Sequence, residues 1–373
     1  MKIESYILSN KGKIRPENED SFAEGEAEGE AEGEAEGEAE GEGEAEGEGE
    51  AAGKNDNINT WIICDGMGGG AAGKFASSLT SKLVLEHIQQ AENSQTLALR
   101  QYYDKNLPFH SLCLAESIQL ANRMLFNLSI SYPSLQGMGT TACALTLHDN
   151  TAYIAHVGDS RMYLFKNTKI HQLSRDHSFV MELLEDKEIS RKEAVKFKQK
   201  NVITRALGVN KHCDLDLYIQ PITTHTKFFL MCTDGLWNVV SENEIESEIL
   251  NSDNNPEMIC RNLIDKANSK GGPDNITVAV VKIIEHDKPK AAFSSYYEKV
   301  ITVSNKDKAF LKAQDKILPG IIKDIKKLLP QAVKKAHSRE IMMNILLYSV
   351  VSAVIISILF LINMRIQMSQ VAP

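Results

Sequence analysis

Three stretches of this sequence place an acidic residue at the end or the start of an apolar run. One run ends at Asp65 and a second ends at Asp234, while Asp274 lies in a turn just before the apolar residues 276–281. An apolar run that stops at Asp-Gly is typical of a buried strand followed by a tight turn. Each carboxylate is therefore expected at the end of a rigid element.

A further acidic pair, Glu19 and Asp20, follows Arg15 near the start of the chain. If the strands are neighbours, these carboxylates gather at one edge of a sheet, where they cannot all stay ionised without a cation. Oxygen-only ligands suit Mg²⁺ or Mn²⁺ better than zinc. A single Asp-Gly is also an ordinary turn dipeptide. Its repetition beside a run of glycines favours a metal site.

The order of these stretches resembles the metal-dependent serine/threonine protein phosphatases of the protein phosphatase 2C type, in their bacterial branch. The resemblance covers roughly residues 1–284. The matching motifs are Arg15 with Asn18-Glu19-Asp20, Asp65-Gly66-Met67-Gly68-Gly69, Gly139-Thr140-Thr141, Gly158-Asp159-Ser160-Arg161, Asp176-His177-Ser178, Thr204-Arg205-Ala206-Leu207-Gly208, Thr233-Asp234-Gly235-Leu236 and Gly272-Pro273-Asp274-Asn275.

The resemblance implies roles for individual residues. Asp65 would bridge two metal ions, and Arg15 would clamp the phosphate with its planar guanidinium. The metal ligands would be Glu19 or Asp20 (directly or through water), Asp65, the carbonyl of Gly66, Asp234 and Asp274, with Asp159 joining Asp234 at a weaker third ion. For Asp159, simple capping of its turn stays an equal alternative. Asn275, Thr204 and Arg205 are expected to support the site. His177 is expected either to support a metal ligand or to be an ordinary packed histidine, and we favour the second.

Two divalent ions about 3.5–4 Å apart can share a water, lower its pKa and align it with phosphorus. We therefore predict a protein-serine/threonine phosphatase that hydrolyses phosphoserine and phosphothreonine through a water or hydroxide bridging two Mg²⁺ or Mn²⁺ ions. Met67 and Gly70 stand where relatives carry a histidine, which leaves the general acid unassigned. A catalytically silent module that binds phosphoproteins or scaffolds a membrane complex is the alternative. A hydrolase of small phosphorylated metabolites is a third interpretation.

Apolar residues at helical spacing in 71–92 and 112–130 are followed by short strand-like runs at 142–147, 151–157 and 162–165. This succession predicts an α+β fold. The resemblance implies a β-sandwich of two mainly antiparallel sheets flanked by helices, in four α/β/β/α layers. The catalytic domain is expected to span residues 1–285, with a flap at 178–201.

Charge is unevenly distributed along the 373 residues, although the net charge is only −9. Residues 24–50 hold 14 Glu and no basic residue, whereas residues 288–339 hold 13 Lys or Arg against 4 Asp or Glu. Alternating Glu with Gly or Ala repels itself and lacks apolar side chains. We interpret 24–53 as a disordered acidic insert and 286–340 as a basic juxtamembrane linker.

Residues 341–362 carry no charge, a length that suits one transmembrane helix. We predict this helix at 341–363, followed by a short tail at 364–373. The basic segment before it places the catalytic domain on the cytoplasmic side of a membrane, expected to be a bacterial inner membrane. Expected partners are phosphorylated proteins and a serine/threonine kinase or its targets, with no nucleic acid. The six cysteines show no Cys-x-x-Cys spacing and are expected to be reduced thiols.

Overall fold

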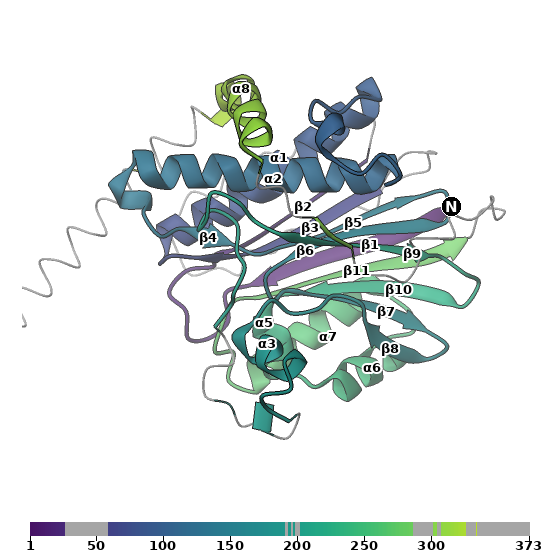
Figure 1. The fold of residues 1–373 in the computed structure, drawn as a ribbon. Helices are drawn as coiled ribbons and strands as arrows, with labels where there is room; N and C mark the ends of the chain where they lie inside the picture. Colours follow the sequence, from purple (N-terminus) through teal and green to yellow (C-terminus); the bar gives the residue numbers. More distant parts are fainter. Residues whose placement is uncertain are drawn as a thin grey trace, which may run out of the picture.

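Two antiparallel sheets face each other at the centre of the molecule (Figure 1). The computed structural model describes residues 1–26, 59–190, 193–194, 197, 202–285, 301–303, 307–325 and 333. The five-stranded sheet runs in the order β1 (Lys2–Asn10), β11 (Ile276–Glu285), β10 (Thr226–Cys232), β7 (Arg161–Lys166) and β8 (Lys169–Gln172). The seven-stranded sheet runs in the order β12 (Ile301–Val303), β9 (Leu215–Pro221), β6 (Thr151–Val157), β5 (Ala142–His148), β3 (Asn59–Met67) and β2 (Asp20–Glu26), with β4 (Gly139–Thr140) paired to β3.

Helices cover the outer face of each sheet (Figure 1). On the seven-stranded sheet lie α1 (Ala71–Ser94) and α2 (Phe109–Ser131), and on the five-stranded sheet lie α5 (Asp234–Trp237), α6 (Glu242–Asn251) and α7 (Pro256–Ser269). The short elements η1 (Arg100–Tyr102), η2 (Pro133–Leu135) and α3 (Phe179–Glu185) lie between them in the chain. The predicted α+β sandwich with flanking helices is confirmed.

Strand β3 shows why the run that ends at Asp65 is apolar almost throughout. Trp61 and Ile63 pack between the two sheets, whereas Ile62 and Cys64 face the layer of α1 and α2. Successive side chains of a strand point to opposite faces, and here both faces are buried. The polar alternation of a half-exposed strand is therefore missing, and the apolar run continues to Asp65.

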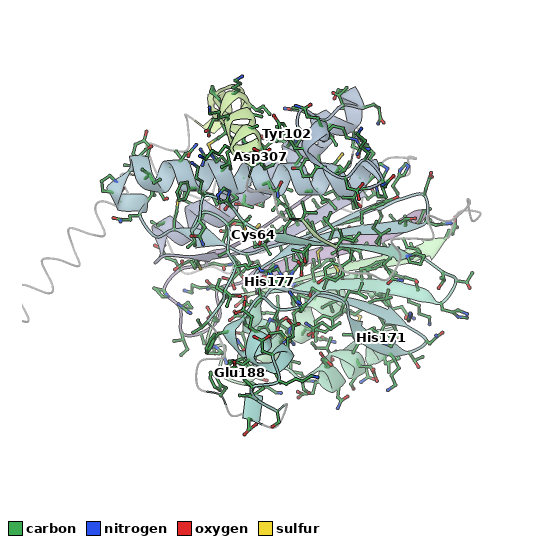
Figure 2. The ribbon with its side chains drawn as sticks, viewed as in Figure 1. Cys64, Tyr102, His171, His177, Glu188 and Asp307 are labelled. Atoms are coloured by element: carbon green, nitrogen blue, oxygen red, sulfur yellow. The ribbon has the colours of Figure 1, made fainter. Side chains whose placement is uncertain are left out.

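The chain beyond β11 returns to the domain within the described residues. Strand β12 pairs with β9, and α8 (Lys308–Ile325) packs on the outer side of α2. Phe310 is buried, with its ring 5.5 Å from that of Tyr102 and 5.8 Å from that of Tyr103. Arg123 of α2 binds both carboxylate oxygens of Asp315 at 2.7 Å. Figure 2 shows Tyr102 and Asp307 beside α8.

Residues 301–303 and 307–325 thus lie on the sandwich, within the segment that we predicted as linker 286–340. That segment is basic in composition, but α8 also has an apolar face. This face is made by Phe310, Leu311 and Leu318, which are all buried. Pro319 lies inside α8. Most of the acidic insert, the predicted transmembrane helix 341–363 and the tail 364–373 lie outside the described residues. Among the described residues, no helix has the length and apolarity needed to cross a membrane.

Phe310→Ala is expected to loosen α8. Removing a buried Phe side chain costs about 3–5 kcal/mol, so the helix should leave α2 more often. The measurement is limited proteolysis, in which residues 307–325 should be cut faster while the sandwich persists. Lys312→Ala, at an exposed position of the same helix, serves as the control and should be cut like the unmodified protein. Equal protection of all three proteins would contradict the packing of α8.

Candidate active site

Asp20 and Asp65 face each other across the β2–β3 pair. The main chain of Asp65 is fixed by the neighbouring Thr140-Thr141. Its N–H donates to Thr141 Oγ1 at 2.9 Å, and its carbonyl accepts from the Thr141 N–H and from Thr140 Oγ1, each at 2.9 Å. The threonine motif therefore sets the position from which the Asp65 carboxylate projects.

The buried carboxylate of Asp20 is held from the opposite sheet. Its Oδ2 accepts hydrogen bonds from Thr233 Oγ1 at 2.9 Å and from Thr277 Oγ1 at 2.6 Å. Thr233 directly precedes Asp234, so the same contacts bring α5 and β11 to Asp20. Its Oδ1 is buried and has no hydrogen-bond partner. Buried acceptors are almost always satisfied, and a cation would satisfy this oxygen.

The acidic side chains at this end of the sandwich disfavour one another's ionisation. Burial raises the pKa of Asp65 well above its ordinary value. The rise is increased by the charges of four neighbouring acids, Asp20, Asp234, Asp159 and Asp274. Burial and the charge of Asp274 raise the pKa of Asp234 to about 6, against a side-chain hydrogen bond with Asp65. Two carboxyl groups can share a hydrogen bond only if one carries a proton. In the absence of cations, this cluster therefore favours the binding of protons.

Two of the predicted ligands bind other groups in this arrangement. Asp274 accepts a hydrogen bond from Arg15 at 2.7 Å, and Glu19 accepts one from the Gly70 N–H at the start of α1, at 2.6 Å. A Cβ at Gly73 would collide with the Glu19 carboxylate. Among the described residues, no three acidic, histidine or cysteine side chains lie close enough together to hold a metal ion in these positions. The roles of Glu19 and of the Gly66 carbonyl stay predictions.

Asp159 lies in the turn between β6 and β7 and is buried. Burial raises the pKa of Asp159 well above its ordinary value, and the charges of Asp234 and Asp176 add to the rise. The Trp237 Nε1–H donates to the Asp159 carbonyl at 3.0 Å. Asp159 is therefore placed near Asp234, as the predicted third ion requires, and the choice between that ion and turn capping stays open.

His177 is more than a packed histidine. Its Nδ1 accepts from the Gly158 N–H at 3.1 Å, and its own main-chain N–H donates to the Gly158 carbonyl at 2.7 Å. Its Nε2 lies 3.1 Å from Asp216 Oδ2; because Nδ1 is the acceptor, Nε2 carries the proton. His177 thus clamps the turn that bears Asp159. Asp216 is not among the residues predicted from the sequence, where its only signal is an acid between two leucines of β9.

The other predicted supports also make fixed contacts. Asn275 accepts from the Glu19 N–H at 2.9 Å and donates to the carbonyls of Lys11 at 2.8 Å and Glu17 at 2.9 Å. The Thr204 N–H donates to the His177 carbonyl at 2.8 Å. Asn275 thereby joins the turn of Asp274 to the loop that leads to Asp20.

Comparison with known proteins identifies the class. The model of the family "Protein phosphatase 2C" matches residues 29–276. The serine/threonine phosphatase stp of Listeria welshimeri is 38% identical over 227 residues, 61% of this chain and 85% of that protein. The crystal structure of the Mycobacterium tuberculosis serine/threonine phosphatase PstP/Ppp superposes with a TM-score of 0.58 at 26% identity, covering 76% of this chain and 99% of that one. The chain belongs to the protein phosphatase 2C family.

A further similar structure is that of the catalytic domain of the serine/threonine protein phosphatase PstP in complex with two manganese ions. Its TM-score is 0.55 at 25% identity, and the match covers 76% of this chain and 99% of that one. The acidic cluster of the present chain has the donor chemistry for such ions, because its side-chain ligands are all carboxylates.

The raised pKa values predict that Mn²⁺ stabilises the protein more as pH rises. The pKa of Asp20 is raised from 3.8 to about 7, because burial outweighs the hydrogen bonds from Thr277 and Thr233. At a pH above the pKa that Asp20 has in the unfolded chain, the buried position of Asp20 therefore lowers the free energy of unfolding. This loss of stability disappears when pH falls below that pKa. Mn²⁺ must displace the protons. Melting temperatures with excess Mn²⁺ and with EDTA should differ more at about pH 8 than at about pH 5.5. Equal differences would contradict proton competition.

Proposed function

We propose that this chain hydrolyses phosphoserine and phosphothreonine in proteins, using two Mg²⁺ or Mn²⁺ ions. The observation that carries the proposal is the convergence of Asp20, Asp65, Asp159, Asp234 and Asp274, from separate elements, at one end of the sandwich. Membership of the protein phosphatase 2C family supports it. So do relatives that are named serine/threonine phosphatases.

The residues fit the ions by charge and by donor type. Asp65, Asp234 and Asp274 would hold the ions together with Asp20, whose Oδ1 has no hydrogen-bond partner. When bound, the ions supply charge neutralisation and an activated water. The chain supplies rigid placement, since Thr140, Thr141, Thr233 and Thr277 fix Asp65 and Asp20 by the hydrogen bonds described above. Holding the acids in place beforehand lowers the cost of assembling the charged site.

Arg15 is the residue that we propose binds the substrate phosphate. Its side chain is 50% exposed and donates to Asp274 at 2.7 Å. If Asp274 turns to a cation, the guanidinium becomes available to phosphate oxygens, which it can bind in bidentate fashion. Arg15 would then orient the ester, and its position at the rim of the acidic cluster supports the predicted clamp.

The test is phosphate release from a phosphothreonine peptide by the full chain. Release should require Mn²⁺ and stop with EDTA. Asp65→Asn should lower the rate by at least about two to three orders of magnitude, because it removes a charge that the site needs. Asp253→Asn is the control, since Asp253 is an exposed acid at a left-handed turn position where Asn is well tolerated.

No release by folded, Mn²⁺-loaded protein would overturn the enzyme and favour a silent phosphopeptide-binding module. Folding is checked by circular dichroism and thermal unfolding. Preference for a small phosphate ester over the phosphopeptide would instead redirect the proposal to a metabolite phosphatase.

We also propose that residues 341–363 anchor the chain as a single pass, with the catalytic domain on the cytoplasmic side of a bacterial inner membrane. The uncharged stretch 341–362 and the basic residues before it support this. Substrates would then be proteins phosphorylated by a serine/threonine kinase near that membrane, or the kinase itself.

Fractionation tests the anchor. The full chain should stay in the membrane pellet after a carbonate wash, whereas residues 1–333 should be found in the supernatant. Recovery of the full chain in the supernatant would refute the anchor without affecting the proposed chemistry.

A further inference from the structure

A buried carboxylate outside the metal cluster connects three parts of the chain. Asp216 of β9 has no exposed surface. In the sheet register it pairs with His156 of β6 on one side and with Thr302 of β12 on the other. The three residues form a cross-strand row in the seven-stranded sheet. Its third member comes from the segment beyond the predicted catalytic domain.

Each oxygen of Asp216 has a donor. Oδ1 accepts from Thr302 Oγ1 at 2.8 Å and from Arg205 at 3.2 Å, and Oδ2 lies 3.1 Å from the protonated Nε2 of His177. Burial alone would raise the pKa of Asp216, but the hydrogen bonds from His177 and Thr302 hold it below the ordinary range. Asp216 is therefore an ionised, compensated carboxylate that can fix its neighbours.

The row reaches the active site through the turn between β6 and β7. His177 binds both the N–H and the carbonyl of Gly158, and His156 Nε2 donates to the Ser160 carbonyl at 2.7 Å. The two imidazole rings lie 4.8 Å apart, and His177 lies in the interior of the molecule (Figure 2). Asp159, between Gly158 and Ser160, is thus held from both sides.

The same carboxylate lies beside the flap. Arg175 is 3.9 Å from Asp216 and binds Glu185, at the end of α3, at 3.0 Å. The Phe179 N–H donates to the Val202 carbonyl at 2.9 Å, and the Thr204 N–H donates to the His177 carbonyl. Both ends of the flap are therefore attached within one or two contacts of Asp216.

We propose that Thr302 is a positioning residue for the phosphatase site: its hydrogen bond to Asp216 holds the His177 clamp on Gly158 and so fixes the carboxylate of Asp159. Docking of β12 on β9 thereby couples the C-terminal segment to the catalytic end of the sandwich. This inference rests on the proposed function, since Asp159 matters here as a metal ligand.

The hydroxyl of Thr302 can be removed with little other change. Thr302→Val keeps the β-branched shape that a strand favours and deletes only the donor to Asp216. Thr302→Ser restores a hydroxyl. Asp315→Asn is the matched control, because it weakens the contact of α8 with Arg123 without touching Asp216. The three variants separate the hydrogen bond from general loosening of the C-terminal segment.

The first measurement is hydrogen exchange of the Gly158 amide in the metal-free full chain, which requires no activity. Loss of one hydrogen bond should speed this exchange by about three- to tenfold in Thr302→Val. Thr302→Ser should exchange like the unmodified protein, and so should Asp315→Asn. The second measurement is the Mn²⁺ concentration that gives half-maximal phosphate release, which should rise in Thr302→Val by about three- to tenfold with little change in the maximal rate.

Unchanged Gly158 exchange in Thr302→Val would overturn the positioning role even if the melting temperature fell. Equal acceleration in Asp315→Asn would also overturn it, because the effect would then come from loosening of the segment. Failure of the phosphatase proposal is distinguishable from both. In that case the unmodified protein releases no phosphate, whatever its exchange pattern.

Discussion

Repulsion among acidic side chains is the constraint on which this structure depends. Asp20, Asp65 and Asp234 come from different elements, and burial, followed by the charges of neighbouring acids, opposes the ionisation of each. Such a group is stable only if the surrounding chain is firmly folded and if protons or cations compensate the charge. The sandwich provides the first condition, since β3, which ends at Asp65, and β10, which leads to Asp234, are buried on both faces. The second condition makes metal dependence a consequence of the fold.

The hydrogen bonds around the cluster act on main chain and carboxylates alike. Thr233 and Thr277 hold Asp20 from the five-stranded sheet, while Thr141 holds Asp65 within the seven-stranded sheet. Because β2 and β3 belong to one sheet and β10 and β11 to the other, these bonds close the end of the sandwich across its two layers. Small hydroxyl side chains are suited to this place, since each donates without adding charge.

Most of the acidic cluster could be predicted from the sequence, because local pattern encodes it. Asp65 and Asp234 each follow an apolar run, and a strand end can be recognised within a few residues. Asp216 could not be predicted in this way, because its partners His177 and Thr302 lie far from it in the chain and meet it only through β-sheet register. The docking of α8 was missed for a related reason: its apolar face has meaning only against α2, whereas its basic composition is visible directly.

Among the described residues, the acidic cluster and Asp216 are both buried, and the difference between them separates structure from catalysis. Asp216 is compensated by groups that cannot leave, namely the guanidinium of Arg205, the imidazole of His177 and the hydroxyl of Thr302, and its pKa lies below the ordinary range. Burial, together with the charges of neighbouring acids, raises the pKa values of Asp65 and Asp234, and the guanidinium of Arg15 is shared with Asp274 at a half-exposed position. A carboxylate with permanent partners can only hold its neighbours in place. One left uncompensated is available to a metal ion, so the pattern of compensation itself distinguishes the residues that hold the site from those that act in it.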